Sequence, residues 1–175
     1  MQNSFFRKLD TKFELSELEK GLKIALPLFD HRNQVCVNSE PGVENPLYYN
    51  LGGIKGIGEP VCSEINPQFK DTVFEKILNC LDCKSARARV MRLGGRSCYS
   101  MHWDTTPRFH IALQTHPTSY LFFHDHIPFH LPKDGHIYWV DTRKPHSAIN
   151  CGTEPRYHFV VVDPFSEGLP KGGYL

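Results

Sequence analysis

The sequence lacks the features that would assign it to a membrane, to export or to nucleic acid. No run approaches the ~20 consecutive apolar residues that span a bilayer. Residues 1–20 mix both signs of charge without a continuous apolar stretch, so they do not resemble a secretory signal. Twenty Lys and Arg against nineteen Asp and Glu leave a net charge of +1, which attracts neither nucleic acid nor an anionic membrane. We therefore expect a soluble cytoplasmic protein with no membrane or nucleic-acid partner.

The cysteines do not follow the pattern of a disulfide scaffold or a zinc site. Without an export signal, the six thiols are expected to stay reduced and free. Cys80 and Cys83 form a CxxC pair, but no second pair stands at the spacing that completes a tetrahedral zinc site. Because the two share one face of a helical pattern, we interpret them as small, partly buried residues.

Length and composition indicate one globular domain. The chain has 175 residues, of which 40% are hydrophobic and 22% charged, and this is enough to build a core without disulfides. We expect a single domain over residues 1–175. Within it, residues 1–84 form a helical and loop elaboration, residues 85–163 form a β core, and residues 164–175 form a tail.

The N-terminal half shows helical periodicity. Thr11 and Glu14 have the spacing of a capping box, and apolar residues then recur at helical intervals until Pro27. A second apolar stripe predicts a helix over residues 67–83, with Asn66 as its N-cap. Between the helices we expect a short strand over residues 34–37 and a long ordered loop over residues 41–60.

After Lys84 the sequence changes to short β-prone runs separated by turn residues. Runs of this kind at close intervals predict an antiparallel sandwich or barrel. The last run, Phe159–Val162, is apolar throughout, which indicates a central strand. The predicted strands cover residues 87–93, 98–103, 109–114, 120–123, 129–131, 136–140, 147–150 and 157–162.

Three features of the β half fit one metal site. His102 and Asp104 form an HxD motif at the end of a predicted strand, where residues i and i+2 share a face. His146 begins a later strand that a closed barrel brings back beside the pair. Two imidazoles and one carboxylate on one face are the ligand set of non-haem Fe(II). Arg156, ten residues further on, has the guanidinium fork that binds a carboxylate through two parallel hydrogen bonds.

Each feature has a plain structural alternative. An HxD pair arises by chance in a chain with ten His, and a single strand histidine is more often a hydrogen-bonded core residue than a ligand. The joint occurrence, in this order and at strand ends, favours a metal site. The basic stretch that follows the second helix is interpreted as a solvated strand face, with a phosphate- or peptide-binding rim as the alternative. It comprises Lys84, Arg87, Arg89, Arg92 and Arg96.

The β half resembles the aspartyl/asparaginyl β-hydroxylase family of Fe(II)- and 2-oxoglutarate-dependent oxygenases. The resemblance spans residues 87–163, and its motifs are His102-Trp-Asp104, Arg108-Phe-His110, Gly135–Asp141, His146–Asn150 and Arg156-Tyr-His158. It implies a mainly β fold with flanking helices, a cupin-like double-stranded β-helix or jelly roll. It also implies Fe(II), 2-oxoglutarate and O2, with His102, Asp104 and His146 as metal ligands and catalytic centre. Arg156 would bind the distal carboxylate of 2-oxoglutarate, and Arg108 and His110 would contact the cosubstrate or the substrate.

The resulting functional hypothesis is a dioxygenase that forms succinate and CO2 as it hydroxylates its substrate. The substrate is an amino-acid residue of a protein or peptide, or a small amino-acid-like molecule. Val162 stands where related nucleic-acid demethylases carry a second arginine, which argues against that branch. Two alternatives stay open: a metal-binding cupin-type module without oxygenase turnover, and a structural β-sandwich with incidental histidines. Arg156 distinguishes the oxygenase from the cupin-type module, because a module that only binds a metal needs no carboxylate clamp.

Overall fold

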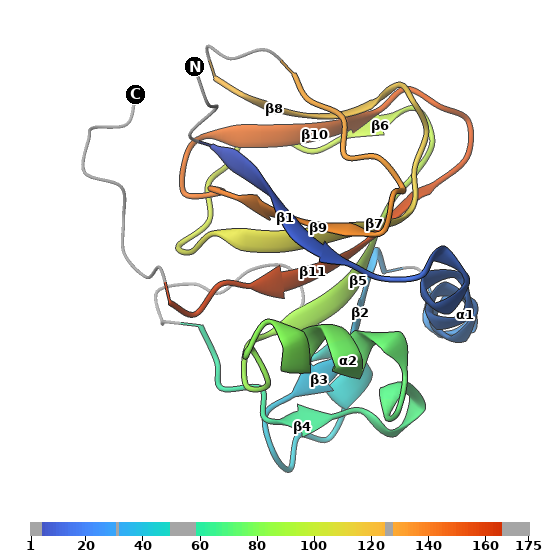
Figure 1. Cartoon of the computed structure of the whole chain (residues 1–175), viewed down its shortest axis with the longest axis vertical. Helices are drawn as coiled ribbons and strands as arrows, with labels where there is room; N and C mark the ends of the chain where they lie inside the picture. The colour runs from blue at the N-terminus through green and yellow to red at the C-terminus, as the bar shows by residue number, and fades with distance from the viewer. Residues whose placement is uncertain (1–4, 31, 50–58, 125–127, 166–175) are drawn as a thin grey trace.

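The computed structural model describes residues 5–30, 32–49, 59–124 and 128–165. Two antiparallel sheets face each other, a large one in the order β1-β9-β7-β11-β5-β2 and a small one in the order β6-β10-β8 (Figure 1). This is a double-stranded β-helix, so the predicted fold class is confirmed. The strands of the large sheet are β1 Phe6–Lys12, β2 Gln34–Cys36, β5 Ala88–Leu93, β7 Arg108–Gln114, β9 His136–Val140 and β11 Arg156–Val162. The small sheet contains β6 Ser97–Cys98, β8 Ser119–Phe123 and β10 His146–Asn150, and β3 Asn38–Ser39 pairs with β4 Glu64–Ile65.

The large sheet has one apolar and one polar face, which follows from strand alternation. On β11, Tyr157, Phe159 and Val161 point to the helices and join the main core, whereas Arg156 and His158 line the opposite face. The same alternation holds along β5 and β7. The apolar face packs on helices α1, Leu15–Ala25, and α2, Val73–Cys80. The polar face is thereby left to form a site.

Helix α1 forms where its apolar stripe predicts, although its start differs from the prediction. Thr11 belongs to β1, and Glu14 is the N-cap residue without a side-chain cap, so the capping-box prediction is wrong. Pro27 lies in a 3-10 turn, Leu26–Leu28, that ends the helix as expected. A Cβ on Gly21 would lie 2.9 Å from Val73, which shows how closely α1 approaches α2.

Two elements of the N-terminal half depart from the prediction of helix and loop. Strand β1 pairs with β9 at the edge of the large sheet, and its exposed, charged residues Arg7 and Lys8 suit an edge strand. The second helix begins at Val73 rather than at residue 67, because Thr72 supplies the N-cap hydroxyl to Phe74. A separate 3-10 turn, Pro67–Phe69, precedes it. The short strand near residue 34 is confirmed as β2. Of the predicted loop over residues 41–60, residues 50–58 lie outside the described residues, and Pro46–Tyr48 forms a 3-10 turn.

The β half follows the predicted strands closely. Strand β9 has the predicted bounds, and β11 lies between β7 and β5, so the expectation of a central last strand is confirmed. Two of the predicted strands are longer than those in the structure. Of residues 98–103 only Cys98 lies in a strand, and of residues 129–131 only Phe129 forms a bridge, to Leu121.

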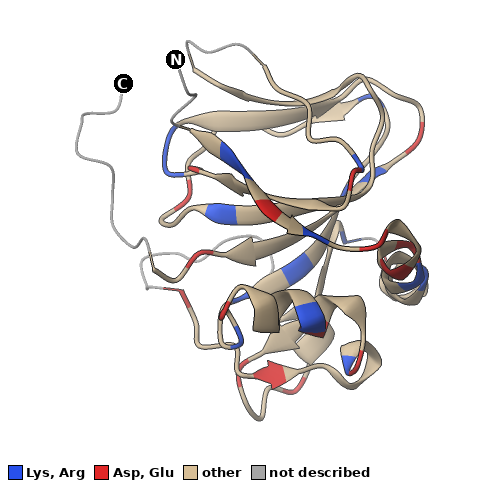
Figure 2. Cartoon of the chain, viewed as in Figure 1, with Lys and Arg blue, Asp and Glu red and all other residues tan. Residues whose placement is uncertain are grey.

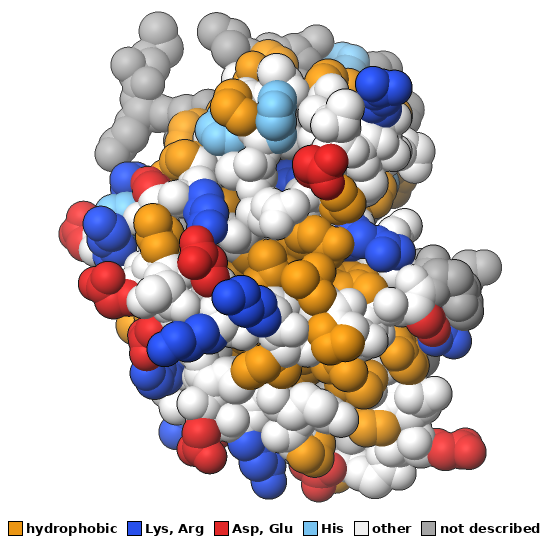
Figure 3. Space-filling model, turned by 90° about the vertical axis from the view of Figure 1, so that its right-hand side faces the viewer, with side chains coloured by type: hydrophobic (Ala, Val, Ile, Leu, Met, Phe, Trp, Pro, Cys, Tyr) orange, Lys and Arg blue, Asp and Glu red, His pale blue; other side chains and the backbone are white. Residues whose placement is uncertain are grey.

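Charged residues of both signs are spread over strands and helices, in line with the small net charge (Figure 2). The face on the α1 side carries hydrophobic side chains at its centre with charged ones around them (Figure 3). Leu15 and Ile24 of α1 are each more than a third exposed, so the helix does not bury all its apolar side chains. All six cysteines are free, as expected. No helix among the described residues is long and apolar enough to cross a membrane.

Candidate active site

A cavity of about 250 Å³ lies between the polar face of the large sheet and the small sheet. All six residues that the sequence singled out line it: His102, Asp104, Arg108, His110, His146 and Arg156. The sheet register places the large-sheet members at successive levels. His110 lies opposite Val160, His158 opposite Met91, and Arg156 opposite Leu93. The topology therefore brings into one cavity residues that are up to 54 positions apart in the sequence.

The HxD motif is not presented by a regular strand, which corrects the expected geometry. His102 forms an isolated antiparallel bridge with His146, with backbone N···O distances of 3.0 and 2.8 Å, and Asp104 lies in the irregular segment that follows. The bridge sets the two imidazoles side by side, with 4.4 Å between ring centroids. The pairing of His102 with β10, rather than strand alternation, brings the histidines together.

Both histidines are held in the tautomer that suits a metal ligand. Nδ1 of His102 lies 2.8 Å from the carbonyl oxygen of Ser100, and Nδ1 of His146 lies 2.9 Å from that of Lys144. Because a carbonyl oxygen only accepts, each Nδ1 donates, and each Nε2 keeps its lone pair. A backbone carbonyl behind the imidazole is a common partner of metal-bound histidines. Burial lowers the pKa of His146, which favours the neutral ring that binds a metal.

Asp104 forms an ion pair with Arg108. Burial alone would raise the pKa of Asp104, but the Arg108 guanidinium, the two histidines and a hydrogen bond with Thr142 keep this pKa below its usual value. Its Oδ1 lies 3.4 Å from Nη2 of Arg108. Within the described ranges, no group of three His, Cys, Asp or Glu side chains is arranged to hold a metal ion. The donor types and the histidine tautomers fit Fe(II), while the carboxylate lies toward Arg108.

Arg156 lines the cavity from the first residue of β11. Arg156 is 7% exposed, and none of the described carboxylates forms an ion pair with its guanidinium. Burial lowers its pKa to about 10, which still leaves the guanidinium charged at neutral pH. A buried cation costs free energy unless an anion compensates it. The cavity therefore suits an anionic ligand at Arg156.

His110 and His158 lie on neighbouring strands, with 5.8 Å between ring centroids. Both rings are almost fully buried, and all four ring nitrogens lack a hydrogen-bond partner. Burial, reinforced by the Arg156 charge, lowers the pKa of His110 to about 3 and that of His158 well below its usual value. Two neutral imidazoles with unused donors are thus available to a ligand in the cavity.

The buried histidines make stability depend on pH. Because the pKa of His110 falls from 6.5 to about 3 on folding, the unfolded chain binds more protons over that range. The contribution of His110 to the free energy of unfolding is therefore present above pH 6.5 and is lost as the pH falls toward the folded pKa. In His110→Gln, we expect the decrease in unfolding free energy between pH 7 and pH 5 to shrink by about 2 kcal/mol.

Urea unfolding of wild type and variant at both pH values measures this difference. His116→Gln is the matched control, since His116 is exposed and bonds locally to Thr118. An unchanged pH dependence in His110→Gln would show that His110 is not buried as a neutral ring.

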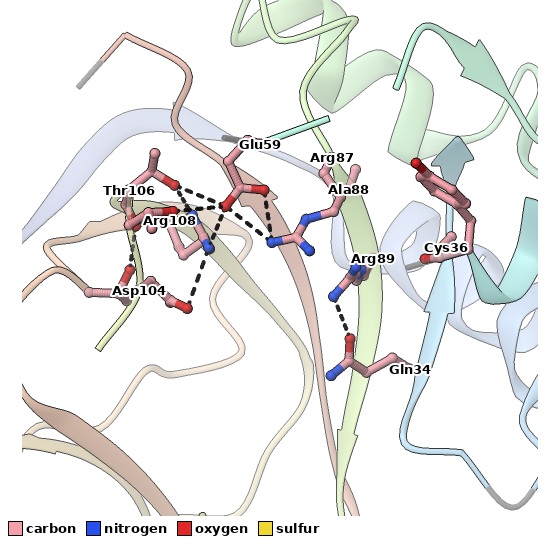
Figure 4. Close-up of polar contacts among 12 residues, drawn as sticks. Gln34, Cys36, Glu59, Arg87, Ala88, Arg89, Asp104, Thr106 and Arg108 are labelled. Atoms are coloured by element: carbon pink, nitrogen blue, oxygen red, sulfur yellow. Dashed lines mark hydrogen bonds and ion pairs between the residues drawn. The ribbon is translucent and has the colours of Figure 1, made fainter. Parts of the chain in front are cut away.

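The basic stretch is a solvated face only in part: Lys84 and Arg96 are exposed and Arg92 is half-buried, but the prediction is wrong for Arg87 and Arg89. Arg89 of β5 and Arg87, which directly precedes β5, are each 8% exposed and both line the cavity. Burial and mutual repulsion lower the pKa of Arg87 to about 10. Arg89 donates to Gln34 at 2.7 Å, and Arg87 forms an ion pair with Glu59 (Figure 4). The apolar residues that alternate with them, Ala88 and Val90, face the core.

Glu59 is the polar residue of this region that sequence reasoning missed. Its carboxylate lies 2.9 Å from Nη2 of both Arg87 and Arg108. It follows a glycine-rich segment and belongs to no motif, so nothing in the sequence pointed to it. His158, in contrast, could be inferred from its alternation with Arg156.

The double-stranded β-helix is similar over almost its whole length to solved oxygenase structures. An oxidoreductase of the 2OG-Fe(II) oxygenase family from Burkholderia pseudomallei aligns with a TM-score of 0.57 at 14% identity, covering 98% of this chain and 90% of that chain. The viral collagen prolyl hydroxylase of Paramecium Bursaria Chlorella virus-1, solved with 2OG, aligns with a TM-score of 0.56 at 14% identity, covering 91% and 95%. A prolyl-4-hydroxylase of Pseudomonas putida aligns with a TM-score of 0.56 at 8% identity, covering 91% and 92%.

Sequence comparison adds no closer relative, since neither a family model nor a curated protein matches the chain. At 8–14% identity the structural likeness establishes the fold, and the activity has to be argued from the site. The expected relation to 2-oxoglutarate oxygenases agrees with these neighbours. The narrower relation to the aspartyl/asparaginyl β-hydroxylases is not supported by them and stays a prediction.

Proposed function

We propose that the protein is an Fe(II)- and 2-oxoglutarate-dependent dioxygenase that hydroxylates its substrate. The observation that carries the proposal is a single cavity that contains two Nδ1-anchored histidines, a carboxylate and, on the opposing sheet, a buried arginine. Fe(II), 2-oxoglutarate and O2 are the reagents that this set suits. The likeness in fold to 2-oxoglutarate oxygenases supports the same assignment.

Each residue has a distinct part in the proposal. His102 and His146 offer Nε2 to the metal, because their Nδ1 atoms are tied to the backbone, and Asp104 offers a carboxylate. Arg156 binds the distal carboxylate of 2-oxoglutarate through two parallel N–H donors. His110, and with it His158, donates to the remaining carboxylate oxygens, since its ring nitrogens are otherwise unpartnered. Arg108 stands beside Asp104 and contacts cosubstrate or substrate.

The bound metal supplies the chemistry that protein groups cannot, the activation of O2 coupled to oxidation of 2-oxoglutarate to succinate and CO2. The two sheets exclude water from the cavity and fix the orientation of the cosubstrate. A metal-binding cupin-type module is the alternative, and the buried Arg156 disfavours it because such a module has no use for an uncompensated buried cation.

The substrate is proposed to be an amino-acid residue of a peptide or protein, or a small amino-acid-like molecule. Two of the similar structures are prolyl hydroxylases by name. The aspartyl/asparaginyl β-hydroxylase motifs favour a different residue, so both peptide classes belong in the assay. We place the enzyme in the cytoplasm as part of the proposal, and the six free cysteines support a reducing compartment.

Anaerobic addition of Fe(II) and then 2-oxoglutarate tests the function directly. We expect the weak visible absorption band of a metal–keto-acid chelate, and succinate formation when O2 is admitted. A folded protein that gives neither would reject the oxygenase proposal, and metal binding without succinate would favour the cupin alternative. Mass spectrometry of peptide and amino-acid panels for a gain of one oxygen then identifies the substrate class.

A further inference from the structure

A buried chain of alternating charges runs from Arg87 through Glu59 and Arg108 to Asp104 (Figure 4). Nη2 of Arg108 lies 2.9 Å from Glu59 Oε1 and 3.4 Å from Asp104 Oδ1. One nitrogen is therefore shared between two carboxylates, and Glu59 has the shorter ion pair. The side chains of Arg87, Glu59 and Arg108 are 8–9% exposed, whereas that of Asp104 is 29% exposed.

Arg108 has little freedom to leave this arrangement. Its Nη1 donates to the carbonyl oxygens of Thr106 and Pro107 at 3.0 and 3.2 Å, and to the hydroxyl of Thr106. Nη2 consequently stays between Glu59 and Asp104. Since the group is buried, solvent and salt screen these charges only weakly. A change in the charge of one carboxylate therefore changes the electrostatic environment of the other.

We propose that Glu59 is a positioning residue for the metal site, which takes the shorter ion pair with Arg108 and so keeps the Asp104 carboxylate available to a divalent cation. The inference rests on the proposed function, because it presupposes that Asp104 is a metal ligand. Glu59 acts through Arg108 and does not touch the metal ligands itself.

Two effects give the direction of the change when Glu59 loses its charge. Among the described carboxylates Arg108 would then pair with Asp104 alone, which holds that carboxylate back from the metal. The cluster of two guanidinium groups and two carboxylates would also lose one of its two negative charges. This raises the positive potential beside the site. Both effects weaken cation binding. Loss of Arg87 has the opposite sign, because it removes a cation and leaves Glu59 entirely to Arg108.

The experiment measures Mn(II) affinity by electron paramagnetic resonance in the full chain, with 2-oxoglutarate at saturation. In Glu59→Gln we expect the dissociation constant to rise about 10- to 100-fold, the range for residues behind metal ligands. Glu59→Asp, which keeps the charge, should recover part of the loss. Arg87→Gln should leave the affinity unchanged or increase it. Glu64→Gln, the same substitution at an exposed residue, is the control.

The opposite effects expected for Glu59→Gln and Arg87→Gln on Mn(II) affinity distinguish a positioning role of Glu59 from a merely structural one. If Glu59→Gln stays within twofold of wild type, or if Arg87→Gln weakens Mn(II) binding as well, the inference is wrong. Should Glu59→Gln not fold, the result for Arg87→Gln decides alone: weaker binding contradicts the inference, and equal or tighter binding supports it. A wild-type protein that binds no Mn(II) rejects the proposed function, whereas normal wild-type binding with an unaffected Glu59→Gln rejects only this inference.

Discussion

Replacement of His146 by alanine is expected to abolish metal binding and, with it, all consumption of 2-oxoglutarate. His146 is 5% exposed and lines the cavity, and because its Nδ1 donates to the Lys144 carbonyl, its Nε2 is the atom available to a metal. The loss of a ligand should exceed the ~10- to 100-fold effect of residues behind the ligands. We therefore expect Mn(II) affinity to fall by more than ~100-fold and succinate formation to reach background.

The control is His116→Ala, which removes an exposed imidazole that hydrogen-bonds to the nearby Thr118. It should bind Mn(II) as wild type does. Circular dichroism must show that both variants are folded, because His146 also forms the backbone bridge to His102. A folded His146→Ala protein that retains metal affinity would remove His146 from the ligand set and, with it, the basis of the proposed centre.

Replacement of Arg156 by glutamine is expected to separate cosubstrate binding from metal binding. The buried guanidinium can donate two parallel hydrogen bonds to a carboxylate, each worth about 1.5–3 kcal/mol when charged. Affinity for 2-oxoglutarate should therefore fall by about 100-fold or more, while Mn(II) affinity without cosubstrate changes little. Arg156→Lys, which keeps the charge and loses the fork, should lie between the two.

Calorimetric titration of Mn(II)-loaded protein with 2-oxoglutarate measures this effect. Arg7→Gln serves as the control, because Arg7 is an exposed residue of β1 and lies over the ring of Trp139. Equal loss of metal and cosubstrate affinity in Arg156→Gln would indicate a collapsed cavity. Unchanged 2-oxoglutarate affinity would show that the distal carboxylate binds elsewhere.

The strands of the β half were predictable because their signal is local. A short β-prone run between turn residues sufficed to predict β9, and a continuous apolar run sufficed to predict the central position of β11. Strand β1 was missed since an exposed edge strand carries little apolar signal, and Thr72 rather than Asn66 caps the second helix. In both places a tertiary contact, with β9 and with the core around Phe74, selected among local alternatives.

By itself the sequence predicted side chains that line the candidate site, two imidazoles, a carboxylate and a guanidinium, because these residue types in this order suggested one shared site. The alternation of Arg156 with His158 also indicated that these two side chains share one face of β11. Only the tertiary structure decided that Arg87 and Arg89 face inward and that Glu59 joins them. Burial and ion pairing arise between segments far apart in the chain, and no local pattern encodes the partner that a buried charge will meet.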